Sequence, residues 1–237
     1  MKLPPLVEAT LLRRYKRFLA DVRLPDGTEL TAHCPNPGRM TSCARPDIPC
    51  RISHHPGKGR KLEWTLQQTC MDGTWILVNT ALPNGIVDEA IRAGRIPELA
   101  GYESLEREVR LPPRPDGKSS RIDLRLQGPD RPACWVEVKN VTLLDDDGVL
   151  RFPDAVSARA TKHLEELVAL VEAGERAVLF FHVGRGDGSH VEPAEAIDPV
   201  YAAAIREAVG KGVEVVAYRG EIGVEAIEIG EAVEVRV

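Results

Sequence analysis

Two acid-bearing stretches place the strongest constraint on this chain of 237 residues. In the first, apolar residues such as Ile122 and Leu124 alternate with polar ones, so Asp123 lies on the polar face of an expected strand. In the next apolar stretch, Glu137 and Lys139 share one face. If the strands pair antiparallel, the Cβ atoms of Asp123 and Glu137 come within about 5–8 Å of each other. The pattern predicts two carboxylates and an ammonium at one point of a sheet.

This trio of side chains suits metal-assisted hydrolysis of a phosphodiester. Two carboxylates this close repel each other unless a cation lies between them, and Mg²⁺ or Mn²⁺ prefers such oxygen ligands. The metal would lower the pKa of a bound water, and Lys139 could orient that water and offset phosphate charge. We therefore predict Asp123, Glu137 and Lys139 as catalytic residues, with both acids also binding metal. The alternative is an ordinary cross-strand ion pair on a solvated face.

Two further acids are candidates for the same metal. Glu89 falls in an expected helix just before the strands, and Glu108 falls in or near the first of them. Either carboxylate could bind the metal through water. The alternative for each is a surface glutamate.

The second half of the chain has the pattern of an α/β domain, which we expect to span residues 84–237. A helical pattern follows Pro83-Asn84-Gly85, and further helices are expected to begin at Asp154 or Ser157 and at Asp198. The expected strands are residues 105–111, 121–126, 134–141, 177–183 and 213–218. Three strands in sequence followed by alternating helices and strands predict a sheet with helices on both faces.

The first half, residues 1–83, reads as short strands. Alternating runs lie at residues 18–24, 30–34 and 62–70, with turn residues at Pro25-Asp26-Gly27. Asp72-Gly73 turns the last run into a fourth strand candidate at residues 75–78. Little helical pattern interrupts them. A small β-barrel of the oligonucleotide-binding (OB) type is the expected fold.

Charge is distributed unevenly along the chain. The net charge of −5 does not suggest a nucleic-acid binder, but the first 83 residues are basic and the acidic excess lies in the second half. Basic residues can neutralise phosphates, and aromatic residues among them can stack on unpaired bases. The residues expected to bind nucleic acid are Arg13, Arg14, Lys16, Arg17, Lys58, Arg60, Lys61 and Lys162.

The five cysteines lie at positions 34, 43, 50, 70 and 134. An odd number without a Cys-x-x-Cys pair favours buried reduced thiols, although zinc binding by Cys34, Cys43 and Cys50 with His33 or His54 stays open. No apolar stretch approaches the roughly 20 residues of a membrane span, and no signal peptide is evident. We therefore expect a cytoplasmic protein without membrane association.

Eight segments, in order along the chain, match a known family. They are residues 13–21 (RRYKRFLAD), 33–36 (HCPN), 78–80 (VNT), 98–102 (ELAGY), 120–123 (SRID), 137–143 (EVKNVTL), 152–156 (FPDAV) and 162–164 (KHL). On these segments the chain resembles the sugar fermentation stimulation protein A family along almost its full length.

The resemblance implies an N-terminal OB-like barrel followed by an α/β domain of the restriction-endonuclease-like, PD-(D/E)xK type. In that superfamily the equivalents of Asp123, Glu137 and Lys139 hold metal and assist hydrolysis, and an acid matching Glu89 often joins them. The family is described as DNA-binding, with a suggested role in regulating sugar-utilisation genes. Many nucleases of the superfamily pair as dimers, so a homodimer is an open option.

Two functions follow. The first is a DNA-binding protein with a nuclease domain that depends on Mg²⁺ or Mn²⁺. The second is a non-catalytic DNA-binding regulator of sugar-utilisation genes, although no helix-turn-helix is evident. RNA stays open as a substrate, because nothing in the sequence indicates a group that senses a 2′-hydroxyl.

Overall fold

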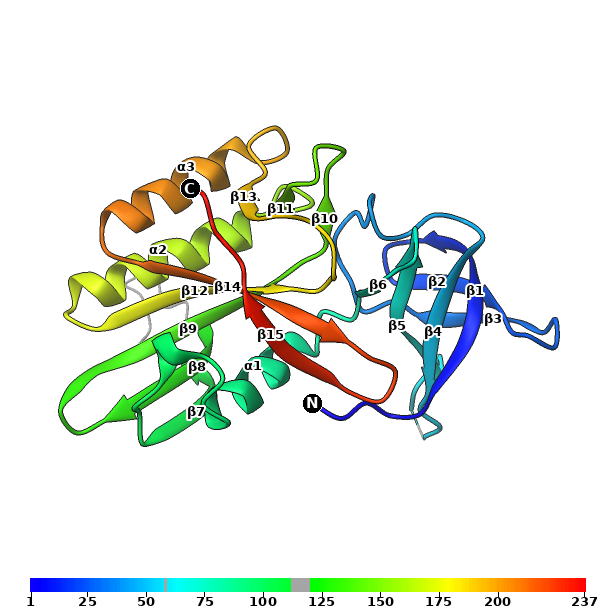
Figure 1. Ribbon diagram of the computed structural model, residues 1–237, viewed down its shortest axis with the longest axis horizontal. Helices are drawn as coiled ribbons and strands as arrows, with labels where there is room; N and C mark the ends of the chain where they lie inside the picture. The colour runs from blue at the N-terminus through cyan, green and yellow to red at the C-terminus, as the bar shows by residue number, and fades with distance from the viewer. Residues whose placement is uncertain (58, 112–119) are drawn as a thin grey trace.

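The computed structural model describes residues 1–57, 59–111 and 120–237. A β-barrel formed by the N-terminal strands lies beside a larger α/β domain, at the right and left of Figure 1 respectively. Residues 112–117, whose prolines and Gly117 predict a turn-rich linker, and Lys58 lie outside the described residues. Within the described residues, none of the helices is both long and apolar enough to span a membrane.

Six strands form the barrel. They are β1 (Leu6–Tyr15), β2 (Leu19–Arg23), β3 (Glu29–His33), β4 (Ile48–His54), β5 (Trp64–Met71) and β6 (Thr74–Leu77). Their order is β3-β2-β1-β4-β5-β6, and a parallel pairing of His33 with Thr65 joins β3 to β5 and closes the barrel. Alternating residues such as Ala20 and Val22 are fully buried inside it. The expected OB-like barrel is confirmed.

Two of the barrel strands were absent from our sequence prediction. A register shift between Leu11 and Arg13 breaks the alternation of β1, because a bulge moves the following side chains to the other face. Pro49 interrupts the alternating run of β4, and a proline argues against a strand when the sequence is read alone. Pairing with neighbouring strands overrides both local signals.

The α/β domain contains a mixed sheet with helices on both faces, as expected. Its sheet order is β15-β14-β12-β9-β8-β7, with β12 parallel to both β9 and β14. The strands are β7 (Ser104–Arg110), β8 (Arg121–Gly128), β9 (Arg131–Val141), β12 (Arg176–Val183), β14 (Glu214–Ile222) and β15 (Ile227–Ala232). A second sheet consists of β10 (Leu143–Leu144), β11 (Leu150–Phe152) and β13 (Val191–Pro193).

Three α-helices cover the sheet. They are α1 (Pro83–Arg92), α2 (Ala158–Glu172) and α3 (Pro199–Gly210), and a short 3₁₀ helix, η1, spans Pro97–Leu99. In Figure 1, α2 and α3 lie on one face of the sheet and α1 on the other. Ser157 caps α2 by accepting a hydrogen bond from the Ala160 N–H, and Asp198 caps α3 in the same way. Both helix starts match the sequence prediction.

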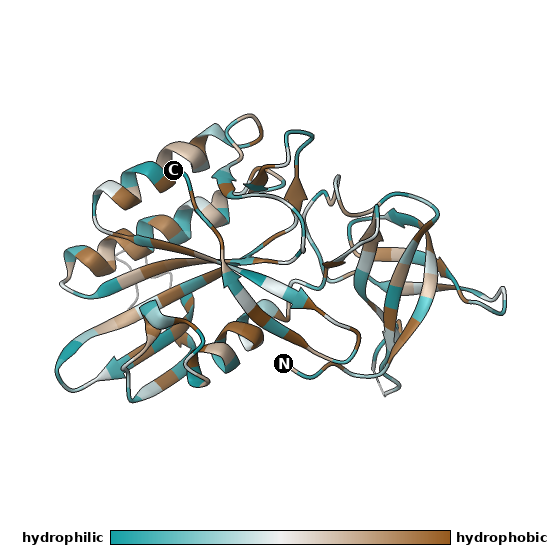
Figure 2. Ribbon diagram, viewed as in Figure 1, coloured by the Kyte–Doolittle hydropathy of each residue, from teal (hydrophilic) through white to brown (hydrophobic). Residues whose placement is uncertain are grey.

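The central strand β12 is buried on both faces. Val178 and Phe180 pack toward α1, whereas Leu179 and Phe181 pack toward α2 and α3. A parallel strand enclosed by helices on both sides has to be apolar throughout. Figure 2 accordingly shows hydrophobic residues along β12, and alternating hydrophilic and hydrophobic residues along α2 and α3.

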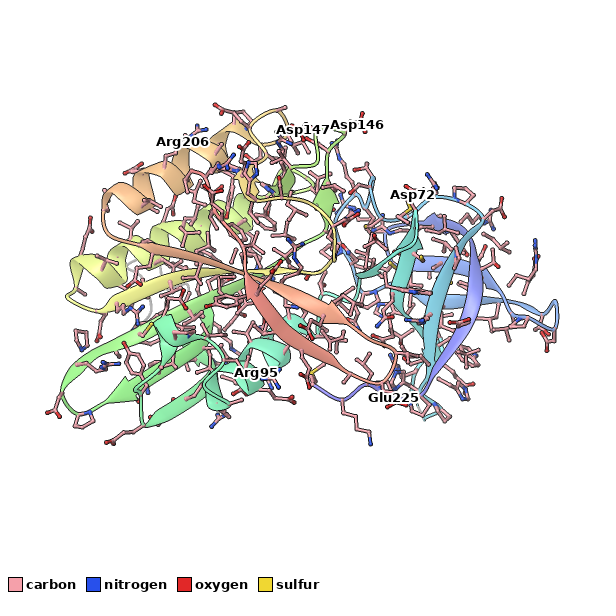
Figure 3. The ribbon with its side chains drawn as sticks, viewed as in Figure 1. Asp72, Arg95, Asp146, Asp147, Arg206 and Glu225 are labelled. Atoms are coloured by element: carbon pink, nitrogen blue, oxygen red, sulfur yellow. The ribbon has the colours of Figure 1, made fainter. Side chains whose placement is uncertain are left out.

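Backbone hydrogen bonds join the barrel directly to the α/β domain. The Leu77 N–H donates to the Gly184 carbonyl oxygen over 2.8 Å, and the Gln68 side chain donates to the Gly223 carbonyl oxygen over 2.8 Å. The second bond reaches the β14–β15 hairpin, whose tip Glu225 lies next to the barrel in Figure 3. The Arg185 guanidinium, which is 3% exposed, donates to the carbonyl oxygens of Thr142 and Ser42. These contacts set the position of the barrel against the sheet.

The core packing predicts a large cost for truncating Phe180. Its ring is fully buried and stacks 5.8 Å from the ring of Tyr218. We expect Phe180→Ala to lower the free energy of unfolding by about 3–5 kcal/mol, because it leaves a cavity between the sheet and α1. Val200→Ala, at a residue that is 65% exposed, should change it by less than about 0.5 kcal/mol. Urea titration of both variants measures the difference, and similar losses would contradict this packing.

Candidate functional site

Strands β8 and β9 carry the carboxylates of the site. They pair antiparallel, with Leu124 opposite Val136, and Asp123 comes one step further along beside Glu137. The Asp123 Oδ2 atom accepts a 2.8 Å hydrogen bond from the backbone N–H of Val138. A side chain thus takes the acceptor position that a backbone carbonyl of β8 would otherwise hold. The two strands part here, and Asp123 occupies the opening.

Helix α1 supplies the second partner of Asp123. The Asn84 side-chain amide, in the first turn of α1, donates a 2.7 Å hydrogen bond to Asp123 Oδ1. Both carboxylate oxygens of Asp123 therefore have a protein donor. These two bonds hold the carboxylate in one orientation.

Glu137 is 1% exposed and is surrounded by cationic and imidazole groups. Its Oε1 atom accepts a 2.5 Å hydrogen bond from the Lys139 ammonium and is also in contact with His163 Nδ1. The other ring nitrogen of His163 lies 3.5 Å from Arg159 Nε on the same helix. Glu137 Oε2 is buried and makes no hydrogen bond to any described residue. Burying a carboxylate oxygen without a hydrogen-bond partner costs free energy, so this oxygen is available to bind a ligand.

The two acids respond to burial in opposite ways. Burial and the charge of Glu137 raise the pKa of Asp123 to about 6, against the opposing hydrogen bond from Val138. Burial also acts to raise the pKa of Glu137, but His163 and Lys139 outweigh it and hold that pKa below its usual value. Glu137 therefore stays ionised, and the repulsion between the two carboxylates disfavours ionisation of Asp123. A cation between them would offset this repulsion.

These carboxylates open into a cavity of about 620 Å³ between the barrel and the α/β domain. Asp123, Glu137 and Lys139 all line it. The other polar or charged residues of the wall are Arg17, Asn36, Thr80, Asn84, Glu108, Asn140, Thr142, Arg151, Asp154, Ser157 and Arg159. The site therefore belongs to both domains, since Arg17 and Asn36 come from the barrel.

The barrel's side of the cavity is a turn at residues 36–40 that is fixed from two directions. The Arg14 guanidinium donates to the carbonyl oxygens of Asn36, Gly38 and Arg39 over 2.7, 2.8 and 3.2 Å. From the other domain, the Asp154 carboxylate accepts a 3.1 Å hydrogen bond from the Met40 N–H. A Cβ atom on Gly38 would lie 2.2 Å from an Asp154 oxygen, so any larger residue there would displace the Asp154 side chain that holds the turn.

The structure separates the two additional acids that we expected to bind metal. Glu108 lines the cavity on β7, where the neighbouring pairs Arg107–Leu124 and Val109–Ile122 place it across from Asp123. Glu89 instead pairs with the N-terminal amine over 3.0 Å and is exposed.

This position corrects our expectation for Glu89. It lies five residues after Asn84, which turns its side chain about 140° around the helix from the one that contacts Asp123. Asn84 therefore holds the place on α1 that we expected Glu89 to hold.

The basic residues expected to bind nucleic acid do not gather at one place. Among those that the structure describes, Arg17 alone lines the cavity, and Arg14 donates hydrogen bonds to the carbonyl groups of the 36–40 turn. Arg13 pairs with Asp21, Arg60 donates to Thr65, and Lys162 pairs with Glu166. Lys16 and Lys61 are exposed. The role of Arg14 is thus to support the wall of the site.

The cysteines do not form a metal centre in the described parts of the chain. All five are free thiols, and four are buried. Across residues 1–57, 59–111 and 120–237, no group of three or more His, Cys, Asp or Glu side chains is arranged to hold a metal ion. The zinc hypothesis therefore has no support from the geometry, and any metal at Asp123 and Glu137 would need ligands from water or substrate.

Several residues of the site were missed by our sequence reading. Asn84 was read as part of a boundary turn, and Asp154 as one of two alternative helix starts. The resemblance to the family could have indicated two of these regions. Residues 33–36 and 152–156 both match the family, although no catalytic role was predicted for either. The structure shows that the first leads into the 36–40 turn and that the second contains Asp154, which holds it.

The raised pKa of Asp123 predicts a pH-dependent cost to stability. Because the folded-state pKa of about 6 exceeds the unfolded value near 4, the folded chain binds this proton more strongly, and stability falls as pH rises through that window. The stability of Asp123→Asn relative to the parent should therefore improve by up to about 3 kcal/mol between pH 4 and pH 7, measured by urea titration. Arg151 lowers the pKa of Asp147 to about 2, so the stability that this pair contributes is lost only below about pH 4, and Asp147→Asn should show little change relative to the parent between pH 4 and pH 7. A stability difference between Asp123→Asn and the parent that does not change with pH would exclude this charge arrangement.

Comparison with known proteins matches both parts of the chain to one family. Residues 12–78 match the family model described as the SfsA N-terminal OB domain, and residues 81–226 match the model described as the sugar fermentation stimulation protein RE domain. Among the relatives, the homolog from Acidithiobacillus ferrooxidans is 50% identical over 98% of each chain. The homolog from Geobacter sulfurreducens is 51% identical over 96% of this chain and 94% of its own.

A solved structure supports the fold. The chain matches Pyrococcus furiosus SfsA with a TM-score of 0.87 and 27% identity, over 100% of this chain and 98% of the other. Matching domains, in the same order and over nearly the full length, leave one assignment: the chain belongs to the sugar fermentation stimulation protein family.

Proposed function

We propose that this protein binds nucleic acid and hydrolyses its phosphodiester bonds with a divalent metal held by Asp123 and Glu137. One observation carries the proposal: the buried Glu137 carboxylate, the half-buried Asp123 carboxylate and the Lys139 ammonium line one cavity, and one oxygen of Glu137 has no partner among the described residues. Perturbed acids that converge in a cavity are a common feature of catalytic sites.

The donor set fits a hard cation. Mg²⁺ and Mn²⁺ take oxygen ligands, and Mg²⁺ is usually held by one or two carboxylates together with waters and substrate phosphates. That arrangement agrees with two acids that lie side by side at the site. The solved relative from Pyrococcus furiosus is described as a complex with Ca²⁺, which also prefers oxygen ligands. We infer the same class of ion here.

The surrounding residues have separable roles. A metal bound between the acids would lower the pKa of a coordinated water and offset phosphate charge. Lys139 places an ammonium on the same edge, where it can donate to a phosphate oxygen or to the attacking water. His163 contacts Glu137 and fixes its direction, and Asn84 does the same for Asp123. Glu108 faces the cavity and could bind the metal through water.

Nucleic acid is the substrate that agrees with both domains. OB barrels commonly bind oligonucleotides, and here the barrel is basic while the α/β domain holds the acids. DNA is the proposed partner, with RNA as the alternative.

A non-catalytic nucleic-acid binder is the second candidate, as in our regulator hypothesis. The observation in its favour is that Glu137 already has the Lys139 ammonium and His163 as partners, so its charge is balanced without a metal. In that case the trio would be a structural feature. Cleavage under any metal condition separates the two functions.

The cleavage prediction is direct. With Mg²⁺ or Mn²⁺, the protein should cut labelled DNA or RNA, and chelator should stop it. We expect Asp123→Ala and Lys139→Ala each to lower the rate by on the order of a hundredfold or more, because each removes a group from the reacting centre. Binding measured in chelator by fluorescence anisotropy should persist in both variants. Binding without cleavage in every metal would support the second candidate.

Metal binding predicts a separate stability effect. Ca²⁺ or Mn²⁺ should raise the melting temperature of the parent protein, since a ligand that binds only the folded state stabilises it by RT ln(1 + [L]/Kd). At a metal concentration of 100 Kd the gain is about 2.7 kcal/mol. The shift should vanish in Glu137→Gln and remain in Glu89→Gln, whose carboxylate pairs with the N-terminus instead. Equal shifts in all three proteins would place the ion elsewhere.

A further inference from the structure

We propose that the cavity takes an unpaired nucleic-acid strand, and that the β1–β2 turn guides it, with Arg17 binding a phosphate and Phe18 stacking on a base. The inference rests on the proposed function and deepens it, because it names the form of the substrate. It assigns roles to a turn on the barrel that contributes Arg17 to the cavity lined by Asp123 and Glu137.

The turn has a strained and well-defined backbone. Tyr15 pairs with Leu19 across the hairpin, so Lys16, Arg17 and Phe18 form its loop. Lys16 and Arg17 have φ angles of +47° and +62°, a left-handed conformation that few residues other than glycine adopt. A 2.7 Å hydrogen bond from the Phe18 N–H to the Lys16 carbonyl oxygen closes the loop. Strain of this kind is concentrated at functional sites, where surrounding structure maintains it.

Arg17 offers an uncommitted cation at the cavity. It is exposed, and among the described residues its guanidinium makes no hydrogen bond or ion pair, whereas Arg13 and Arg14 both have partners. It lines the same cavity as Asp123 and Glu137. A free guanidinium facing a candidate metal site suits a phosphate, which it can bind with two parallel hydrogen bonds.

Phe18 offers an aromatic face beside that cation. Its side chain is 46% exposed, which makes it one of the few large apolar residues on the surface. Its ring stacks 6.4 Å from the ring of His33, at an interplanar angle of 29°. The Cys34 N–H donates to the Phe18 carbonyl oxygen over 2.9 Å and holds the turn against β3. Exposed aromatic groups next to a basic groove bind unpaired bases, which have free faces for stacking.

The shape of the cavity favours one strand over a duplex. Its volume of about 620 Å³ is within the range of sites that enclose a small ligand. The barrel's 36–40 turn and Asp154 both line it, and the Met40–Asp154 hydrogen bond joins the two domains at this part of its wall. An unpaired strand can bring one phosphate to the carboxylates that line the cavity, whereas a duplex would have to bring its second strand into the same space. The position of the acids therefore fits a single strand, a flap or an unpaired end.

The test measures binding of the full chain in chelator, so that cleavage plays no part. Fluorescence anisotropy compares one labelled DNA strand, its RNA counterpart and its DNA duplex, and 2-aminopurine in the strand reports base stacking. The variants are Phe18→Leu, Phe18→Tyr and Arg17→Ala. Arg206→Ala is the control for Arg17→Ala, because it removes an exposed arginine that does not line the cavity. Figure 3 shows Arg206 on α3.

We expect tighter binding of the single strand than of the duplex. Phe18→Leu should weaken binding at least about fivefold and abolish the 2-aminopurine quenching, whereas Phe18→Tyr should keep both. Arg17→Ala should lower the slope of log K against log salt by about 0.7, the effect of one lost phosphate contact on a single strand, and Arg206→Ala should leave it unchanged. Stronger binding of the RNA strand would identify RNA as the source of the substrate.

Two results would overturn the inference. Duplex binding as tight as single-strand binding would exclude an unpaired strand, and unchanged binding in Phe18→Leu and Arg17→Ala would exclude the turn. Metal-dependent cleavage of a duplex would leave the proposed nuclease function intact in either case. If the stacking and salt effects are as expected but no metal supports cleavage, the result would support the inference and reject the proposed nuclease function.

Discussion

The burial of Glu137 next to Asp123 is the constraint on which the rest of the site depends. A buried carboxylate is costly unless charged or polar partners compensate it, and a second carboxylate beside it adds repulsion. Lys139 and His163 converge on one oxygen of Glu137, and Asn84 and the Val138 N–H bind the two oxygens of Asp123. These partners come from β9, α1 and α2, so the site draws on both faces of the sheet.

A second set of hydrogen bonds holds the barrel next to Asp123 and Glu137. Arg14, on β1, holds the carbonyl groups of the 36–40 turn, and Asp154, just before α2, holds the Met40 N–H. The buried Arg185 adds hydrogen bonds to Ser42 and Thr142 on opposite sides of the junction. Both domains therefore contribute to the wall of the cavity.

Much of the site was predictable wherever a local periodicity determines the direction of a side chain. The alternation around Asp123 and Glu137 placed both acids on one face of neighbouring strands, and strand pairing follows that prediction. The helix starts at Ser157 and Asp198 were predictable from capping residues. The prediction for Glu89 was wrong in position, because a helical sequence does not specify which residue of the first turns meets a strand that is distant in the chain.

The two-part fold class and the Asp–Glu–Lys trio were predictable from short-range periodicity and from the resemblance to a family. The packing of the folded chain was needed to show that Asn84 takes the place expected for Glu89, that Arg14 supports a wall of the cavity, and that Arg17 lines it. Each of these depends on the packing of segments separated by tens of residues. The physical reason is that hydrogen-bond partners in a folded chain are chosen by distance in space, which local sequence patterns do not encode.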